Sequence, residues 1–407
     1  MISYLAAIEL IRSHAKLHTH ESVMLQDACG RISAADIYSH MNLPSFNNSA
    51  MDGFALKAAD TVTASAICPV KLRVGATLAA GSDLQNVELA DCIAIMTGAA
   101  VPDDYDAIIP IEQVQVVHEG EQKYILVSDG VESSANLRFA GEDVQQNSLI
   151  VHANQQLRPQ DIMLLAACGV ASVTVYSQIA IALATSGEEI SDKYSQALDF
   201  GQIYNANAPL LQNLATSPVF DLNYHGIIGD SGKELIDLIY NSSAQIIITT
   251  GAVSMGEWDF IPETLREIGA EIIFHKTAIR PGKPILFAKF TDGRYFFGLP
   301  GNPVSSFVGW RFFVIQLIRA MVGKHAEKIS TAIAQNEFHK KHRLRQFLKA
   351  NLSIDDGLAQ LTISREQASF KIAPLTTSNV WAIAGEEQQI KIGDKVQFVP
   401  LIADLFD

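Results

Sequence analysis

The stretch that decides the fold is Tyr295-Phe-Phe-Gly-Leu-Pro-Gly-Asn-Pro303, which runs directly into Val304-Ser-Ser-Phe-Val-Gly-Trp-Arg-Phe-Phe-Val-Ile-Gln-Leu317. An apolar run of strand length meets a turn of glycine and proline, and a long apolar segment follows. We expect a buried strand, a tight turn, and a helix that Asn302 caps and Pro303 begins. Glycine at 301 leaves backbone N–H groups open to an anion, which the helix dipole also favours.

Upstream of this stretch, apolar strands alternate with helical segments. The pattern predicts strands near 179–185, 219–224 and 244–250, and helices near 205–216, 231–242 and 260–269. This alternation is typical of a doubly wound α/β domain with a mostly parallel sheet. The 303–322 helix approaches membrane-span length, but Arg311, Gln316 and Arg319 interrupt its apolar run. We interpret it as a core helix.

The remaining segments predict three further parts. An amphipathic helix and a short second helix open the chain, and another helix near 158–169 ends at Gly169. Short apolar runs between them indicate an inserted β-rich domain, and alternating segments after 326 indicate a C-terminal β-barrel or sandwich. The fold class is therefore multidomain, α/β plus β. The expected domains are an elongated, mixed helical N-terminal domain (1–45 plus 141–177), the β-rich domain (46–140), the α/β domain (178–325) and the C-terminal β domain (326–407).

The composition of the chain excludes some kinds of partner. The 44 acidic and 30 basic residues give a formal charge of −14, which argues against nucleic acid or an anionic membrane surface. Cys29, Cys68, Cys92 and Cys168 lack the spacing of a zinc site, and their apolar neighbours suit small buried thiols in a reducing compartment. The N-terminus does not resemble a secretory signal. We expect a cytoplasmic protein.

Acidic residues follow three strands of the predicted sheet. They occur in Ser186-Gly-Glu-Glu189, in Gly229-Asp230 and in Thr250-Gly-Ala-Val-Ser-Met-Gly-Glu-Trp-Asp259. One such residue is usually a cap or a solvated turn. Because ligands of an open parallel sheet gather at the carboxyl ends of its strands, three acidic ends beside a glycine turn favour a phosphate with a divalent metal. A nucleotide or pyrophosphate is the expected ligand.

A local basic segment complements such a ligand. His275-Lys-Thr-Ala-Ile-Arg-Pro-Gly-Lys-Pro284 supplies Lys276, Arg280 and Lys283 in an otherwise acidic chain. One of the three is as well explained by a solvated strand edge. Two loops in the β-rich part, Asn47-Asn-Ser-Ala-Met-Asp-Gly-Phe54 and Asn136-Leu-Arg-Phe-Ala-Gly-Glu-Asp143, are by themselves typical of Asx-type turns.

Five motifs, taken in order, give the chain a specific resemblance. Ser49-Ala-Met-Asp-Gly53, Asn136-Leu-Arg-Phe-Ala-Gly-Glu-Asp143, Val253-Ser-Met-Gly256, Pro281-Gly-Lys-Pro284 and Leu299-Pro-Gly-Asn-Pro-Val-Ser305 together resemble the molybdopterin molybdenumtransferase (MoeA) family, which includes the gephyrin E-domain. The resemblance implies a homodimer with its active cleft between the α/β domain of one subunit and the small domains of the other. It implies Mg²⁺-dependent insertion of molybdenum from molybdate into adenylylated molybdopterin, with release of AMP. The upstream pterin adenylyltransferase is a further expected partner.

The site residues that the resemblance implies carry over motif by motif. The implied catalytic carboxylates are Asp52, Asp143, Glu189, Asp230 and Asp259. Among these, the expected magnesium ligands are Glu189, Asp230 and Asp259. The implied substrate-binding residues are Thr97, Arg138, Gly251, Ser254, Lys276, Arg280, Lys283, Pro300, Gly301, Asn302 and Pro303.

Departures from the family pattern leave alternatives open. Glu188 stands where the family usually has aspartate, and Lys349 where it often has arginine, while Gln367-Ala-Ser369 only echoes its Gly-Ser element. Ala252 replaces a glycine, and we expect its methyl to hinder phosphate approach or to forbid a positive φ. One alternative is a non-catalytic scaffold of the same fold. Another is a nucleotide-binding hydrolase confined to the α/β domain, in which the acidic residues of the β-rich part have no role.

Overall fold

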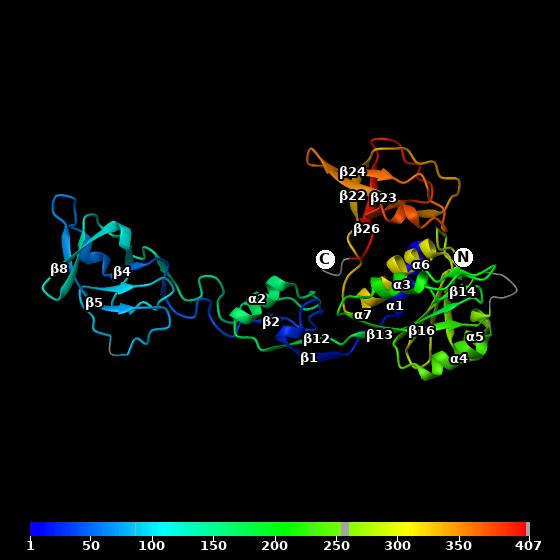
Figure 1. The fold of residues 1–407 in the computed structure, drawn as a ribbon, viewed down its shortest axis with the longest axis horizontal. Coiled ribbons are helices and arrows are strands. Elements are labelled where there is room, and N and C mark those ends of the chain that lie inside the picture. Colours follow the sequence, from blue (N-terminus) through cyan, green and yellow to red (C-terminus); the bar gives the residue numbers. More distant parts are fainter. Residues whose placement is uncertain (86, 230, 254–259, 404–407) are drawn as a thin grey trace. The chain divides into compact units, whose positions relative to one another are not determined.

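The chain forms two units that are each discontinuous in sequence (Figure 1). The computed structural model describes residues 1–85, 87–229, 231–253 and 260–403. The first unit comprises Met1–Ala35, Ala153–Arg158 and Val173–Asp407, and the second comprises Asp36–His152 and Pro159–Ser172. The second unit is thus inserted into the sequence of the first. The finer division into four domains stays a prediction.

A six-stranded sheet of apolar runs forms the centre of the first unit. Its order is β16-β13-β17-β21-β20-β18, in which the first four strands are parallel and β20 is antiparallel to both neighbours. The sheet confirms the predicted doubly wound, mostly parallel architecture, and adds β18 and β20, which the sequence pattern did not predict. The strands are β13 (Ile179–Ser186), β16 (Phe220–Ile228), β17 (Ile246–Thr250), β18 (Glu271–His275), β20 (Leu286–Lys289) and β21 (Tyr295–Leu299).

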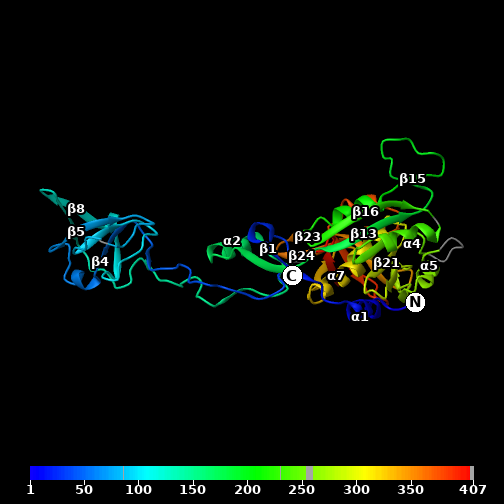
Figure 2. The same ribbon diagram turned by 90° about the horizontal axis from the view of Figure 1, so that it is seen from below.

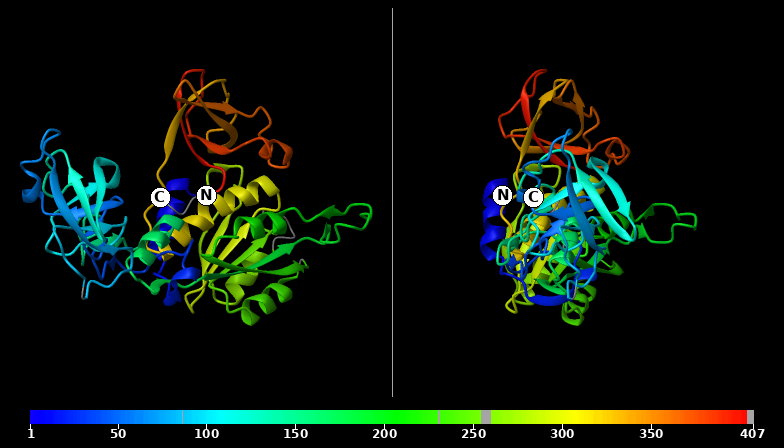
Figure 3. Two further views of the ribbon diagram at one scale, coloured as in Figure 1. Left: turned by 60° about the vertical axis from the view of Figure 1, so that its left-hand side comes forward. Right: turned by 90° about the vertical axis from the view of Figure 1, so that its left-hand side faces the viewer.

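Alternate residues of β13 divide the core of this unit into two layers. Ile181 and Leu183 face a cluster formed with α1, α3 and the helix that follows the glycine turn, whereas Ala182 and Ala184 pack against α4 and α5. Figure 3 shows helices on both faces of the sheet. Because both faces are covered, the central strands β13, β17 and β21 are buried along nearly their whole length. The helices are α1 (Tyr4–His14), α3 (Asn207–Leu214), α4 (Gly232–Asn241) and α5 (Ile261–Glu267).

The helix after the glycine turn runs from Pro303 to Met321 and is the core helix of this unit. Among the described residues it is the one helix long and apolar enough to span a membrane, yet 94% of its apolar window is buried inside the structure. It consists of α6 (Pro303–Gly309), a π-helical segment η4 (Trp310–Val314) and α7 (Ile315–Met321). The interpretation as a core helix is therefore confirmed.

The π-helical segment carries a buried charge. The guanidinium of Arg311 donates to both carboxylate oxygens of Glu327, at 2.7 and 2.6 Å, and its Nε donates to the carbonyl of Pro400 at 3.2 Å. Arg311 is fully buried. A buried arginine is stable only when its charge is paired and its donors are satisfied. Glu327 therefore fixes the chain that leads from the core helix into the C-terminal strands.

The C-terminal strands close into a five-stranded barrel. A barrel is one of the two forms that the sequence predicted for this part, the other being a sandwich. The order β23-β24-β22-β26-β25 returns to β23, and β19 adds to its edge. Phe347 of β23 stacks on Phe312 of the core helix, with 3.8 Å between ring centroids, and Trp381 contacts Phe307 edge-on. The elements are β19 (Ile279–Arg280), β22 (Ser330–Ala334), β23 (Arg345–Asp355), β24 (Leu358–Ile363), η5 (Ala373–Leu375), β25 (Val380–Ala384) and β26 (Lys395–Pro400).

The N-terminal residues pair with two segments from much later in the chain. The N–H of Ile2 donates to the carbonyl of Lys276 at 3.1 Å, and its carbonyl accepts the N–H of Ala278 at 2.8 Å. Strand β1 (His20–Met24) pairs with β12 (Ser172–Tyr176). A short second helix was predicted within residues 1–40; after α1 this stretch instead holds the strand β1, which pairs with β12, and the three-residue 3₁₀ turn η1 (Leu25–Asp27).

An arm connects β13 to α3. It contains the short parallel strands β14 (Ile190–Ser191) and β15 (Ile203–Tyr204), and it extends from the first unit in Figure 2. Asn205 fixes the base of this arm, because its side-chain amide donates to Asp192 at 2.9 Å and to the Tyr224 hydroxyl at 2.9 Å. The same hydroxyl donates to Asp192 at 2.8 Å. The base of the arm is thus tied to β16 of the parallel sheet.

The second unit contains the predicted β-rich part. A mixed sheet of order β7-β4-β6-β5-β9-β8 forms its core, and the short pairs β2/β11 and β3/β10 join distant loops. Its strands are β2 (Ile37–Tyr38), β3 (Asn48–Ser49), β4 (Gly53–Leu56), β5 (Val70–Leu78), β6 (Cys92–Ile95), β7 (Ala107–Pro110), β8 (Val114–Glu119), β9 (Gln122–Val127), β10 (Leu137–Arg138) and β11 (Leu149–Val151). Its helices are the 3₁₀ turns η2 (Ala58–Thr61) and η3 (Ile111–Gln113), and α2 (Pro159–Ala167).

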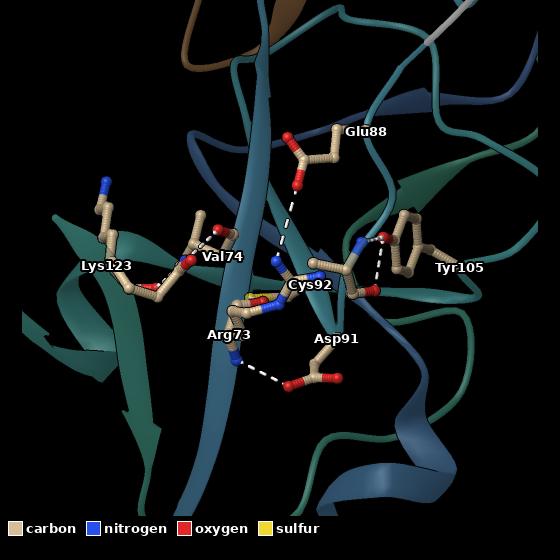
Figure 4. Close-up of polar contacts among 9 residues, drawn as sticks. Arg73, Val74, Glu88, Asp91, Cys92, Tyr105 and Lys123 are labelled. Atoms are coloured by element: carbon tan, nitrogen blue, oxygen red, sulfur yellow. Dashed lines mark hydrogen bonds and ion pairs between the residues drawn. The ribbon is translucent and has the colours of Figure 1, made fainter. Parts of the chain in front are cut away.

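Polar contacts hold the segment before β6 against β5 (Figure 4). The N–H of Arg73 donates to the carboxylate of Asp91 at 2.8 Å, and its guanidinium lies 3.6 Å from Glu88. Burial raises the pKa of the Cys92 thiol to about 12, so this cysteine is an unreactive core residue. Cys168 is also buried, but Cys29 and Cys68 are exposed, which corrects the expectation that all four are buried.

We predict that Glu327→Gln destabilises the first unit by about 3 kcal/mol, because it leaves the buried Arg311 charge without its partner. Urea unfolding followed by tryptophan fluorescence measures this loss. Glu387→Gln is the matched control, since Glu387 and Arg343 are both exposed and lie 3.6 Å apart. That change should cost less than about 1 kcal/mol. Equal losses in the two variants contradict a stabilising role for the buried pair.

Candidate active site

The carboxyl ends of β13, β17 and β21 meet backbone to backbone. Gly251 follows β17 with φ of 97°, and its N–H donates to the carbonyl of Leu299 at 2.9 Å. A Cβ at Gly251 would lie 2.4 Å from the carbonyl oxygen of Ser186, so only glycine fits. A Cβ built on Gly301 would lie 3.7 Å from the Cα of Gly251. The three predicted loops are therefore side by side.

Ala252 corrects one expectation from the sequence. Its φ is 48°, so the extra methyl does not forbid the left-handed conformation; a non-glycine residue pays roughly 1–2 kcal/mol for it. The next residue, Val253, is held by His275, whose Nε2 donates to its carbonyl at 3.0 Å. The loop after β17 is thus anchored by a ring from β18. Ser254 and Asp259, two predicted site residues in this loop, lie outside the described residues.

The glycine turn keeps the predicted positions but not the predicted capping bond. Asn302 occupies the N-cap and Pro303 the first helical position, yet the Asn302 side chain makes no capping hydrogen bond to a described residue. Instead, the Ser306 hydroxyl donates to the carbonyl of Pro300 and closes the turn. A serine inside the helix thus closes the turn, and Asn302 lines a neighbouring pocket.

A pocket of about 440 Å³ lies beside the glycine turn. It brings together four of the predicted substrate-binding residues, namely Arg280, Lys283, Pro300 and Asn302. Its remaining lining residues are Ile279, Pro281, Gly282, Pro284, Ser305, His342, Leu344, Gln367 and Ser369. Among the described residues, no aspartate or glutamate lines the pocket. Two basic side chains, a histidine and several hydroxyl and amide groups suit a small oxyanion.

The barrel side of this pocket was largely missed from the sequence. His342 gave no signal, and Gln367 and Ser369 appeared only as a weak echo of a family motif. Lys349 explains how their loop is held: it is fully buried, and its Nζ donates to the carbonyls of Ala368 at 3.2 Å and Lys371 at 2.9 Å. Burial lowers the pKa of Lys349, and the nearby Glu366 opposes that shift.

Lys276 does not join the other basic residues in the pocket lining. It adopts φ of 76°, and its N–H donates to the carbonyl of Ile285 at 3.0 Å, at the start of the loop that carries Lys283. Its own carbonyl accepts the N–H of Ile2. Gly301 and Pro303 also lie outside the pocket lining. Lys276 therefore shapes the basic loop through its backbone.

One of the predicted magnesium ligands is described. Glu189 is exposed, and its carboxylate folds over the backbone of Gly187, where a Cβ would lie 2.6 Å from Oε2. Its carbonyl accepts the N–H of Ile203 at 2.8 Å. Asp230 lies outside the described residues. Within the described ranges no three His, Cys, Asp or Glu side chains cluster to hold a metal.

The second unit carries three predicted residues and joins two of them, Asp52 and Thr97. Oδ1 of Asp52 accepts hydrogen bonds from the backbone N–H of Thr97 at 2.7 Å and from its hydroxyl at 2.8 Å. These two bonds lower the pKa of Asp52, so it is ionised at neutral pH. Strand β10 places Arg138 opposite Asn48 in the pairing with β3. All three predicted side chains are exposed at this end of the unit.

Asp143 lies further along the loop that follows β10. Its backbone N–H donates to the carbonyl of Leu43 at 3.0 Å, and its side chain is exposed. Its carboxylate makes no hydrogen bond to a described residue. The neighbouring Glu142 instead accepts the N–H of Phe139 at 2.9 Å. The loop thus presents Asp143 while Glu142 stabilises the turn.

The fold and the pocket define an α/β protein with a basic pocket at the carboxyl edge of a parallel sheet. Comparison with known proteins is more specific. Residues 2–169 match the MoeA N-terminal region (domain I and II), and residues 182–320 match the probable molybdopterin binding domain. The chain belongs to the molybdopterin molybdenumtransferase family, which confirms the resemblance found in the sequence.

Relatives support this membership over nearly the whole chain. A molybdopterin molybdenumtransferase of Synechococcus elongatus is 33% identical over 398 residues, covering 95% of this chain and 96% of its own. One of Haemophilus influenzae is 32% identical, covering 93% of each chain. A crystal structure of a molybdopterin biosynthesis MoeA protein of Pyrococcus horikoshii superposes with a TM-score of 0.80 at 26% identity, covering 98% of this chain and 99% of its own. The predicted multidomain fold class is confirmed.

We predict that Thr97→Val raises the pKa of Asp52, because it removes the hydroxyl donor while the backbone N–H bond remains. A pH titration of the Asp52 carboxyl carbon by ¹³C NMR measures the change. The pKa of Asp52 should rise part of the way to that of a free aspartate, and Thr97→Ser, which keeps a hydroxyl, should leave it nearly unchanged. An equal pKa in all three proteins contradicts this account of the Asp52–Thr97 pair.

Proposed function

We propose that this protein inserts molybdenum from molybdate into adenylylated molybdopterin and releases AMP, as a transferase of molybdenum cofactor biosynthesis. Family membership supports the pathway, and the relatives carry this transferase's name. The observation that carries the proposal at the level of residues is the pocket beside the glycine turn. Its lining combines cationic groups with neutral donors and, among described residues, includes no carboxylate.

Molybdate is a tetrahedral dianion, and we propose that it binds in this pocket. Arg280 and Lys283 line it with positive charge, and Ser305, Gln367 and Ser369 offer neutral donors. The positive end of the core helix dipole adds a favourable field at the same place. A neighbouring carboxylate would repel a dianion. The lack of aspartate and glutamate among the described lining residues therefore also favours molybdate binding.

Gly301 supports the approach of a ligand to the backbone. It has no positive φ, and a Cβ there would meet only the Cα of Gly251 at an ordinary 3.7 Å. Neither conformation nor packing against described residues therefore requires glycine. By contrast, Gly251 is required by its φ of 97° and by the carbonyl of Ser186. Glycine at 301 is explained if a phosphate or oxyanion comes close to it.

Release of AMP breaks the bond between the α-phosphorus and the bridging oxygen of the phosphoanhydride, with water as the attacking group. We propose that Lys283 contacts the phosphates of the substrate. We further propose that Asp52 and Asp143 are catalytic carboxylates of this reaction. Glu189 is an exposed hard oxygen ligand, which fits Mg²⁺, and Glu189, Asp230 and Asp259 would hold it. When bound, Mg²⁺ neutralises charge on the leaving phosphate.

Several finer features remain part of this proposal. We propose that the protein works in the cytoplasm as a homodimer, with one active cleft shared between two subunits, and that it receives its pterin from the upstream adenylyltransferase. These features follow from the resemblance of the five motifs. The scaffold alternative predicts binding without turnover. A hydrolase confined to the α/β part is disfavoured, because the relatives match the second unit as well.

We predict that the unaltered protein releases AMP from adenylylated molybdopterin when both molybdate and Mg²⁺ are present, and that Lys283→Ala lowers this rate by about 100-fold. Asp52→Ala should cause a similar loss while leaving the fold intact. Chromatography of the nucleotide product measures the rate. Lys391→Ala, an exposed lysine outside the pocket lining, is the control and should keep the full rate.

Two outcomes separate the competing readings. If the unaltered protein binds the pterin but releases no AMP under any of these conditions, the transferase proposal fails and the scaffold reading is favoured. If turnover is normal in both Lys283→Ala and Asp52→Ala, the reaction stands but the residue assignments fail.

A further inference from the structure

The buried amide of Asn207 reaches the glycine turn from a different part of the chain. Asn207 is the first residue of α3 and is only 4% exposed. Its Nδ2 donates to the carbonyl of Gly301 at 2.7 Å. This is the peptide group that joins Gly301 to Asn302, at the edge of the proposed oxyanion pocket.

This hydrogen bond fixes which way the peptide faces. In a trans peptide the C=O and the following N–H point in opposite directions, so a Gly301 carbonyl directed at Asn207 turns the N–H of Asn302 away from α3. Among the described residues, that N–H has no hydrogen-bond acceptor. Asn302 itself lines the pocket. The free N–H is therefore available to an anion bound there.

Without this anchor the peptide has a competing orientation. Glycine at 301 allows a wide range of backbone angles, so the peptide after it can turn over at little cost. The carbonyl oxygen would then replace the N–H on the pocket side. A partial negative charge in that position repels a dianion, whereas the N–H attracts it.

The surroundings of Asn207 hold its amide in place. Oδ1 of Asn205 accepts the N–H groups of Asn207 and Ala208, each at 3.1 Å, and so fixes the start of α3. Oδ1 of Asn207 is buried and has no partner among the described residues. Turning the amide over would place that oxygen against the Gly301 carbonyl. The Nδ2 of Asn207 thus keeps its hydrogen bond to the Gly301 carbonyl, although its Oδ1 is left without a donor. A buried acceptor without a donor costs roughly 1–3 kcal/mol.

From these contacts we infer that Asn207 is a positioning residue for oxyanion binding. Its amide sets the Gly301–Asn302 peptide so that the N–H of Asn302 faces the pocket. This inference rests on the proposed function, because it takes the pocket to be an oxyanion site. It adds a residue that neither the motifs nor the pocket lining identify.

The test measures molybdate binding by isothermal titration calorimetry on the full chain. Asn207→Asp has nearly the same shape but replaces the donor with an oxygen that repels the Gly301 carbonyl. We expect the Kd for molybdate to rise at least about tenfold, while the Kd for adenylylated molybdopterin changes less than about twofold. Asn213→Asp, on the same helix, is the matched control because Asn213 is exposed and its side-chain amide donates to the Pro209 carbonyl, not to the glycine turn. It should bind molybdate normally.

The outcomes distinguish this inference from the proposed function. If the unaltered protein does not bind molybdate, the proposed pocket is overturned, and the role of Asn207 with it. If the unaltered protein binds and Asn207→Asp binds equally well, only the role of Asn207 is overturned. A parallel loss of affinity for the pterin indicates a general structural effect and also overturns it. Should Asn207→Asp not fold, Asn207→Ala, which removes the donor without adding charge, is measured in the same way.

Discussion

Close contact between backbones at one edge of the parallel sheet is the constraint on which the candidate site depends. The loop after β17 lies against the end of β13 because Gly251 has no side chain to meet the carbonyl of Ser186. That contact leaves room for the turn after β21 to sit beside it, with its backbone uncovered. Parallel strands bring their carboxyl ends to one edge. The absence of a single Cβ then lets three separate loops share that edge.

The pocket beside this edge shows how a chain with an excess of acidic residues can favour an anion locally. Its cations come from the loop between β18 and β20, while its neutral donors come from the core helix and the barrel. The barrel is held to the core helix by stacked aromatic rings and by the pairing of Arg311 with Glu327. The relative placement of the two pocket walls, one from the core helix and one from the barrel, therefore depends on buried contacts outside the pocket lining. Lys349 has a similar supporting role, since its Nζ donates to carbonyls on either side of Ser369.

The sequence was sufficient for features that depend on local pattern. The alternation of strands and helices between 178 and 322 predicted the parallel sheet, and the glycine turn with Pro303 predicted the start of the core helix. Features that depend on tertiary partners were missed or wrong. Asn302 does not cap its helix because Ser306 closes the turn, residues 20–24 are a strand because β12 pairs with them, and Ala252 tolerates a positive φ. His342 has no local signal, and its role in the pocket follows from closure of the barrel.

The pairing of Ile2 with the segment around Thr277 has a consequence for synthesis of the chain. Ile2 can pair with this segment only after residue 277 has been synthesised. In the meantime the whole of the inserted second unit emerges, with its own hydrophobic clusters. Domains fold as they are completed during translation. On this principle the inserted unit can fold before the segment that pairs with Ile2 has been made.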